Sequence, residues 1–183
     1  MMKEFSMHVM DIIQNSIRAG ADLVEIEIEE DSEQDFTTML IKDNGCGMSQ
    51  EFIKAIRDPF TTSRTTRKVG LGIPMLEQTC LQCEGSLDIK SEEGVGTEIF
   101  TRMKLSNIDR PPMGDIGESI FLTVIMNPDI NFTYKHIINK NEFLFNTQEI
   151  RDVLGDVPLN QPDVAEWIKA NLESGLSDIQ KNS

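Results

Sequence analysis

The sequence has few basic residues, and this shortage argues against several classes of binding protein. Its 183 residues include 31 aspartates and glutamates but only 17 lysines and arginines, which gives a formal net charge of −14. A surface this acidic repels phosphate backbones and anionic lipids, so a general nucleic-acid or membrane-surface binder is not expected. A few arginines can still make one cleft basic enough for a single nucleotide.

Cysteines and long apolar runs are also scarce. The three cysteines cannot all pair with one another, and nothing in the composition indicates an oxidising compartment. No apolar run approaches the roughly 20 residues that a membrane-spanning helix needs. The opening residues, MMKEFSMHVMD, lack the pattern of a secretory signal. We therefore expect a cytoplasmic protein.

Hydrophobic spacing predicts one main α/β domain over residues 1–106. Apolar residues at steps of three and four predict a first helix that ends at Gly20, because glycine suits a helix C-terminus. Alternating residues and turn signals predict strands separated by further helices. The expected strands cover residues 23–30, 37–43, 86–91 and 97–105, and the expected helices cover residues 49–57 and 73–83.

Residues 107–183 are predicted to form a small β-plus-helix extension, because prolines and glycines punctuate the chain at 107–117. We expect it to serve as a dimerisation or partner-docking element, and a purely structural cap is the alternative. Its expected strands cover residues 118–126, 130–138 and 142–146, and its expected helices cover residues 146–155 and 162–176.

The first helix carries a polar stripe of Asp11, Asn15 and Arg18 at steps of four and three. An amide oxygen can ligate a hard cation such as Mg²⁺, and a guanidinium can pair with phosphate oxygens. The stripe therefore suits a metal–phosphate group. By itself, the same pattern also fits an ordinary helix whose polar face is solvated.

Two glycine-containing segments each precede an expected helix. Asp43 ends a strand and is followed by Gly45 and Gly47, which permit close backbone approach to a flat ligand. The same residues also fit an ordinary Asp-Asn-Gly turn with no ligand. The later Gly70-Leu71-Gly72 opens a helix, whose free N–H groups form a ready anion site. It is neither a Walker loop nor a Rossmann fingerprint.

The order of these segments is more specific than any one of them. DxxxNxxR on a helix is followed by DNGCGM after a strand, then DPFTTSR, GLG before a helix, and GVGT in a hairpin. Over residues 5–105 this order resembles the GHKL superfamily of ATPases, which includes gyrase, heat-shock chaperones, MutL-type repair proteins and histidine kinases. The resemblance implies an α+β fold of the Bergerat type, a mixed β-sheet covered by helices on one face.

The resemblance also implies ATP and Mg²⁺ as cofactors. In the adenine subsite, Asp43 would accept the adenine amino group, and Thr97 would support the same edge through water. Gly45 and Gly47 would let the purine pack against the backbone.

At the phosphates, the resemblance makes Asn15 the Mg²⁺ ligand and Arg18 a phosphate contact. Gly70, Leu71 and Gly72 would admit the phosphates at a helix N-terminus. The lid residues that could reach the γ-phosphate are Arg64, Arg67 and Lys68.

Asp11 departs from both main patterns of the superfamily. Hydrolases of the class place glutamate there as the base that activates water, and most histidine kinases place asparagine. Aspartate keeps the charge on a shorter side chain. Asp11 is thus the candidate catalytic residue, and both slow hydrolysis and phosphotransfer remain open.

Two subfamilies share the resemblance. NSIRAGA and IKDNGCGM look like MutL-type proteins, whereas DPFTTS and GLGIPML look like sensor kinases and anti-sigma-factor kinases. The short chain and the acidic charge favour the kinase-like group. His8 lies too close to the nucleotide, and His136 lies on an expected strand, so phosphorylation of the chain's own histidines is not expected.

We therefore predict an ATP-dependent switch, or a protein kinase that acts on a separate regulatory partner. The alternatives are a non-catalytic nucleotide-sensing module and a MutL-like slow ATPase. Cys80 and Cys83 have metal-ligand or redox spacing, but steps of three on a helix are also ordinary packing.

Overall fold

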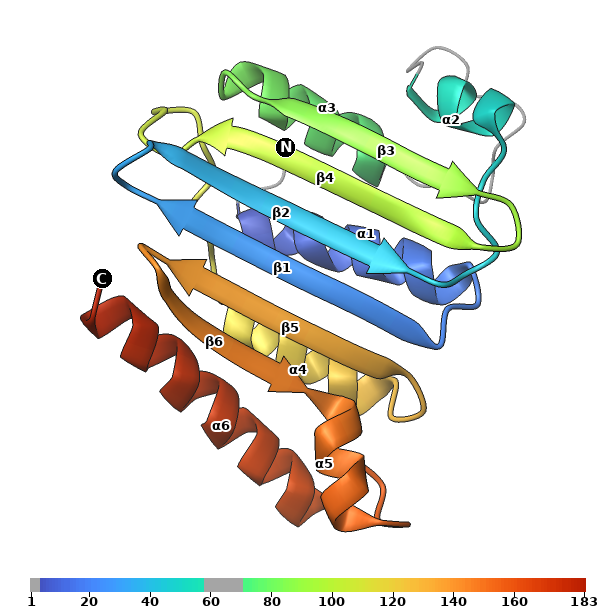
Figure 1. Cartoon of the computed structure of the whole chain (residues 1–183), viewed down its shortest axis with the longest axis vertical. Coiled ribbons are helices and arrows are strands. Elements are labelled where there is room, and N and C mark those ends of the chain that lie inside the picture. Colours follow the sequence, from blue (N-terminus) through green and yellow to red (C-terminus); the bar gives the residue numbers. More distant parts are fainter. Residues whose placement is uncertain (1–3, 58–70) are drawn as a thin grey trace.

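The computed structural model describes residues 4–57 and 71–183, and six strands form one mixed sheet within them (Figure 1). The strands are β1 (Leu23–Asp31), β2 (Phe36–Asp43), β3 (Ser86–Glu92), β4 (Gly96–Lys104), β5 (Asn131–Ile138) and β6 (Asn141–Asn146). The helices are α1 (Phe5–Arg18), α2 (Gln50–Arg57), α3 (Gly72–Gln82), α4 (Ile116–Met126), α5 (Thr147–Leu154) and α6 (Pro162–Lys181).

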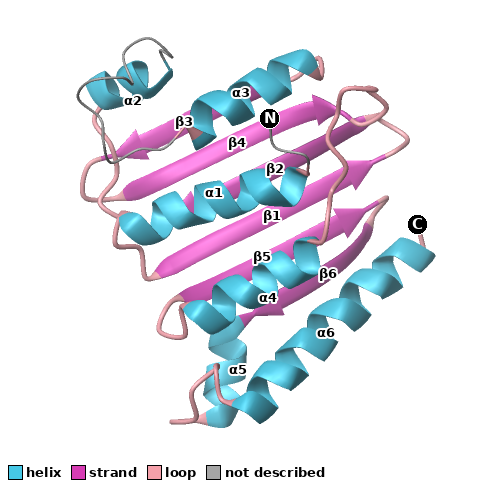
Figure 2. Ribbon diagram, turned by 180° about the vertical axis from the view of Figure 1, so that it is seen from behind, coloured by secondary structure: helices cyan, strands magenta, loops and turns pink. Residues whose placement is uncertain are grey.

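The sheet has the strand order β3-β4-β2-β1-β5-β6, with β1 and β5 parallel and the other neighbours antiparallel. Residues alternate between its two faces. In β1, Val24, Ile26 and Ile28 are buried, and in β2 their partners Met39 and Ile41 are buried. Helices α1, α3 and α4 cover this face, as Figure 2 shows, and the other face carries charged side chains. The predicted fold class is confirmed.

Helix α1 lies between α3 and α4 and supplies much of the core through Val9, Ile12 and Ile13. After β4 the chain passes beside its own N-terminal segment. There the Phe5 amide donates a hydrogen bond to the Pro112 carbonyl at 2.8 Å. The predicted helix end is also observed, with Gly20 at a φ of +77°.

Residues 118–126 were expected to form a strand, and this prediction is wrong, because they lie in helix α4. The segment is rich in β-branched and aromatic residues, which favour strands. Helix α4 packs against both α1 and α6, so it is apolar on several sides and shows no clear helical period. The overlooked signal was Asp115, whose side chain accepts the Glu118 amide at 2.9 Å as a helix N-cap.

The strands predicted at 130–138 and 142–146 are present as β5 and β6, and they lie in the same sheet as the strands before residue 106. Helix α6 packs on α4 and on the edge strand β6, where Gly175 lies against the Phe143 ring. The segment after residue 106 thus shares a continuous hydrophobic core with the first part of the chain.

Among residues 4–57 and 71–183, no helix combines the length and the apolar character needed to cross a membrane.

Candidate functional site

The first and fourth sequence motifs meet at Asp11 and Gly72. Gly72 is the first residue of α3, and a Cβ placed on it would lie 3.0 Å from Asp11 Oδ2 on α1. The Asp11 carboxylate therefore lies at the N-terminus of α3. A negative charge is favourable there, because the free N–H groups make that end of a helix positive.

The other two residues of the predicted polar stripe lie further along α1. Asn15 follows Asp11 by about one helical turn and is half-buried. Arg18 is exposed in the last turn of the helix. Asp11 and Asn15 thus share one side of α1, and Arg18 lies at its solvent-exposed end.

Asp43 lies at the end of β2 and is buried, with 9% of its surface exposed. The Ser16 hydroxyl on α1 donates to Asp43 Oδ2 at 2.6 Å, and the Gly45 amide donates to Asp43 Oδ1 at 2.9 Å. Each carboxylate oxygen has further lone pairs. The carboxylate is therefore fixed in place and can still accept a hydrogen bond from a ligand.

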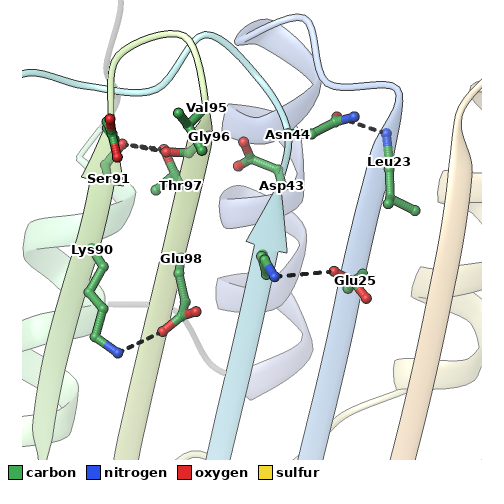
Figure 3. Close-up of a pocket in the computed structure, with 12 residues that line it drawn as sticks. Leu23, Glu25, Asp43, Asn44, Lys90, Ser91, Val95, Gly96, Thr97 and Glu98 are labelled. Carbon is green, nitrogen blue, oxygen red and sulfur yellow. Dashed lines mark hydrogen bonds and ion pairs between the residues drawn. The ribbon is translucent and has the colours of Figure 1, made fainter.

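Thr97 is the cross-strand partner of Asp43, so the two side chains lie on the same face of the sheet (Figure 3). The Ser91 hydroxyl lies 2.8 Å from Thr97 Oγ1, donates to the Gly96 carbonyl at 2.9 Å and accepts the Met48 amide at 2.8 Å. Because Ser91 donates its single hydroxyl proton to the Gly96 carbonyl, the Thr97 hydroxyl donates to Ser91 Oγ. The Thr97 oxygen remains free to accept a hydrogen bond.

Two of these residues, Ser16 and Ser91, were missed by the sequence analysis. Ser16 directly follows Asn15, and its position next to a motif residue was the available signal. Ser91 could be found only from the register of the β3–β4 hairpin, which pairs it with Thr97.

The glycines of the site permit close approach between segments of the chain itself. A Cβ on Gly45 would lie 2.8 Å from Ala19 Cβ, and one on Gly47 would lie 1.9 Å from the Glu92 carbonyl oxygen. The loop after β2 therefore packs closely between the end of α1 and the β3–β4 hairpin. Contact of the same glycines with a purine stays a prediction.

A hollow of about 410 Å³ borders the same strand ends but opens on the helix-free face (Figure 3). Four charged residues of alternating sign cross it in one row: Lys90, Glu98, Lys42 and Glu25. Lys90 pairs with Glu98 at 3.0 Å, and Lys42 pairs with Glu25 at 4.0 Å. The row is electrically balanced and lies on the face opposite Asp43 and Thr97, so it offers no excess positive charge to an anionic ligand.

Part of the predicted phosphate site falls outside the described residues. Leu71 is exposed at the N-cap of α3, next to Gly72. The predicted contacts that lie outside the described residues are Arg64, Arg67, Lys68 and Gly70.

Cys80 and Cys83 are both buried, and burial raises the pKa of Cys80 to about 12. Within residues 4–57 and 71–183, no group of three or more histidine, cysteine, aspartate or glutamate side chains could hold a metal ion. The two thiols therefore contribute to packing between α3 and the sheet.

Both histidines are about 1% exposed. His8 lies on α1 with its Nε2 3.4 Å from the Thr79 hydroxyl, and burial lowers its pKa. His136 lies between the Tyr134 hydroxyl at 2.7 Å and Glu30 Oε1 at 3.0 Å. Neither ring is open to solvent.

Comparisons with known proteins agree with this geometry. Residues 4–107 match the family described as histidine kinase-, DNA gyrase B- and HSP90-like ATPase. A putative sensor protein of Shewanella frigidimarina is 33% identical over 103 residues, which are 55% of this chain and 16% of the sensor protein. Sporulation kinase E of Bacillus subtilis is 34% identical over 65 residues, which are 36% of this chain and 9% of the kinase.

A solved structure, the Aquifex aeolicus MutL ATPase domain complexed with ADP, has the same fold with a TM-score of 0.51 and 17% identity. The match covers 84% of this chain and 70% of the MutL domain. The sequence relatives are several times longer than the matched region, whereas the family model spans more than half of this chain. The chain therefore belongs to the histidine kinase-, DNA gyrase B- and HSP90-like ATPase family.

Proposed function

We propose that the chain binds ATP with Mg²⁺ and acts as an ATP-dependent regulatory switch, or as a protein kinase, on a separate protein partner. The observation that carries the proposal is Asp43. Its carboxylate is held by Ser16 and Gly45 and lies beside Thr97. A fixed, partly buried carboxylate next to a hydroxyl acceptor suits the amino group of adenine.

The phosphate end of the nucleotide would lie toward the N-terminus of α3. Gly72 opens that helix, and Asn15 lies one turn beyond Asp11 on α1, where its amide oxygen would hold Mg²⁺. Bound ATP would supply the transferable phosphoryl group, and Mg²⁺ held by Asn15 would offset part of the negative charge of the phosphates. Arg64, Arg67 and Lys68 are the proposed γ-phosphate contacts, with Arg18 as a further phosphate contact.

Action on a separate partner is supported by the burial of both histidines. A phospho-acceptor must reach the γ-phosphate of ATP, and His8 and His136 are each about 1% exposed. The sensor protein and the sporulation kinases among the relatives make a signalling role reasonable. The proposed acceptor is therefore a serine, threonine or histidine of the partner.

A second candidate function, slow ATP hydrolysis, is favoured by the position of Asp11. Its carboxylate lies at the N-terminus of α3, where the phosphates would bind, and a carboxylate there can act as a general base toward water. Phosphate release in the absence of partner, lost in Asp11→Asn, would support this function. Binding with neither hydrolysis nor transfer would leave the nucleotide-sensing module.

Calorimetric titration of ATP with and without Mg²⁺ tests nucleotide binding directly. We expect Asp43→Asn to weaken ATP binding by about 10- to 100-fold, because a hydrogen bond to a charged group contributes roughly 1.5–3 kcal/mol. Asn15→Ala should make the remaining affinity insensitive to Mg²⁺. Asp31→Asn is the matched control, because Asp31 is a similarly buried carboxylate that accepts the Glu33 and Gln34 amides in the loop after β1.

Equal weakening in Asp31→Asn and Asp43→Asn would mean that the loss reflects general destabilisation and would remove the argument from Asp43. Wild-type protein that binds no ATP at concentrations up to the millimolar range would contradict the proposed function itself.

A further inference from the structure

An apolar groove of about 650 Å³ lies between β6, α5 and the N-terminal half of α6. It lies beyond residues 4–107, which match the ATPase family, and at the opposite edge of the sheet from α3 (Figure 1). Its apolar lining consists of Leu144, Phe145, Ile150, Val153, Leu154, Val164 and Trp167.

Three large apolar side chains of this lining are exposed to solvent. Val153 is 86% exposed, and Leu144 and Trp167 are each 54% exposed. They come from three different elements and converge on one hollow, unlike a single apolar residue scattered on a surface. Exposed tryptophan in a concave apolar site is typical of protein-binding surfaces.

The walls of the groove are fixed by contacts outside it. The Thr147 hydroxyl accepts the Phe132 amide at 2.8 Å and holds the start of α5 on β5. Helix α6 is anchored by Ile168 and Leu172, which are buried in the core. A groove with fixed walls binds a partner without an ordering cost of its own.

The surroundings of the groove are acidic. Glu149 and Asp163 are in its lining, and residues 142–167 carry six carboxylates and a single basic residue, Arg151. The Arg151 guanidinium donates to the Pro128 carbonyl, to the Ile130 carbonyl at 3.0 Å and to Asn131 Oδ1 at 3.0 Å. Its charge is thus engaged with the loop before β5 and does not offset the carboxylates at the groove.

We propose that this groove binds a partner protein through an apolar segment flanked by lysines or arginines. The apolar residues of such a segment would cover Trp167, Leu144 and Val153, and its cations would face Glu149 and Asp163. The acidic rim and the net charge of −14 disfavour a second copy of the chain at this surface. The inference rests on the proposed function for the existence of a partner protein.

Trp167 is the only tryptophan of the chain, so its fluorescence reports on the groove. The probe is a short amphipathic helical peptide of leucine and lysine, titrated into nucleotide-free protein, with a leucine–glutamate peptide of the same pattern as its comparison. We expect the lysine peptide to cause a saturable blue shift of the Trp167 emission, and its binding to weaken as salt is added. The glutamate peptide should bind at least about tenfold more weakly.

Two pairs of variants assign the binding to the groove. Val153→Ser and Glu149→Lys should each weaken binding of the lysine peptide by about tenfold, through lost apolar contact and reversed charge respectively. The matched controls are Ile108→Ser, at a residue 96% exposed, and Asp88→Lys, at an exposed aspartate of β3, and both should bind like wild type.

The proposal is overturned if the two peptides bind equally, if the control variants lose binding as much as the groove variants, or if no shift occurs. A blue shift that grows with protein concentration alone, with dimer formation in sedimentation, would also overturn it in favour of a second copy. The assay contains no nucleotide, so failure here leaves ATP binding to be judged separately by calorimetry.

Discussion

Two regions around the sheet are built on different principles. The Asp43 end, formed by α1, the loop after β2 and the β3–β4 hairpin, is held by hydrogen bonds to polar side chains and by backbone segments in direct contact. The C-terminal edge, formed by β6, α5 and α6, is held by apolar side chains and leaves several of them exposed.

This difference shows how one sheet can carry two surfaces with separate demands. At the Asp43 end, a carboxylate must stay within hydrogen-bonding distance of a ligand, so backbone contacts that allow no added atom are useful. At the C-terminal edge, the surface is lined by side chains rather than by backbone segments in direct contact. Substitutions should therefore affect the two regions unequally.

The largest expected difference concerns glycine replacement in the two regions. A Cβ on Gly96 would lie 2.0 Å from the Asp43 carbonyl oxygen, and its φ is +143°, so we expect Gly96→Ala to lower the free energy of unfolding by more than about 3 kcal/mol. In Gly175→Ala the new Cβ would lie 2.1 Å from the ring of Phe143, a half-buried side chain rather than backbone. Helix propensity offsets part of that cost, so we expect a loss of about 1 kcal/mol.

Urea unfolding of both variants measures this difference. Gly94→Ala is the control for positive φ alone, because Gly94 has a φ of +79° and no atom within 4 Å of an added Cβ. Equal losses in Gly96→Ala and Gly175→Ala would show that the Asp43 end and the C-terminal edge are equally tolerant.

A smaller effect is expected from removal of a buried hydroxyl, at the Asp43 end in Ser16→Ala and within β5, next to the edge strand, in Tyr134→Phe. Ser16→Ala removes a donor to Asp43, so we expect ATP affinity to fall by about 5- to 10-fold. Tyr134→Phe removes a partner of the buried His136, so we expect the free energy of unfolding to fall by about 1–2 kcal/mol with ATP affinity unchanged.

Calorimetry and urea unfolding on both variants separate the two roles. If Ser16→Ala changed only stability, or if Tyr134→Phe weakened ATP binding as much as Ser16→Ala, the assignment of separate roles would be wrong.

The smallest expected effect is a pH dependence caused by His8. Burial lowers its pKa below 6.5, so the unfolded chain binds more protons than the folded chain as the pH falls through this value. The contribution of neutral His8 is therefore fully present above pH 6.5 and is lost as pH falls toward the folded-state pKa, by at most about 1.4 kcal/mol per pH unit.

Urea unfolding at several pH values between roughly 5.5 and 7.5 measures this slope. His8→Leu should make the slope shallower than in wild type, because the titrating group is gone. An unchanged slope in this variant would assign the pH dependence to other groups.

The sequence predicted most of the elements before residue 106, because the alternation in β1 and β2 and the glycines that open α3 are local signals. It also placed Asp11, Asn15 and Asp43 in motifs that the structure brings to one side of the sheet. It failed at residues 118–126, where burial on several sides removed the helical period from α4. It missed Ser16, whose importance depends on a residue 27 positions away.

The sequence by itself determined the family, because the order and spacing of its motifs are local patterns, and it determined the acidic charge. Only the tertiary structure decided which residues support the site. The contacts of Ser16 with Asp43, of Gly72 with Asp11 and of Ser91 with Thr97 depend on helix packing and strand register. The groove at β6 likewise exists only because α5 and α6 pack beside the edge strand, a long-range arrangement that no local pattern encodes.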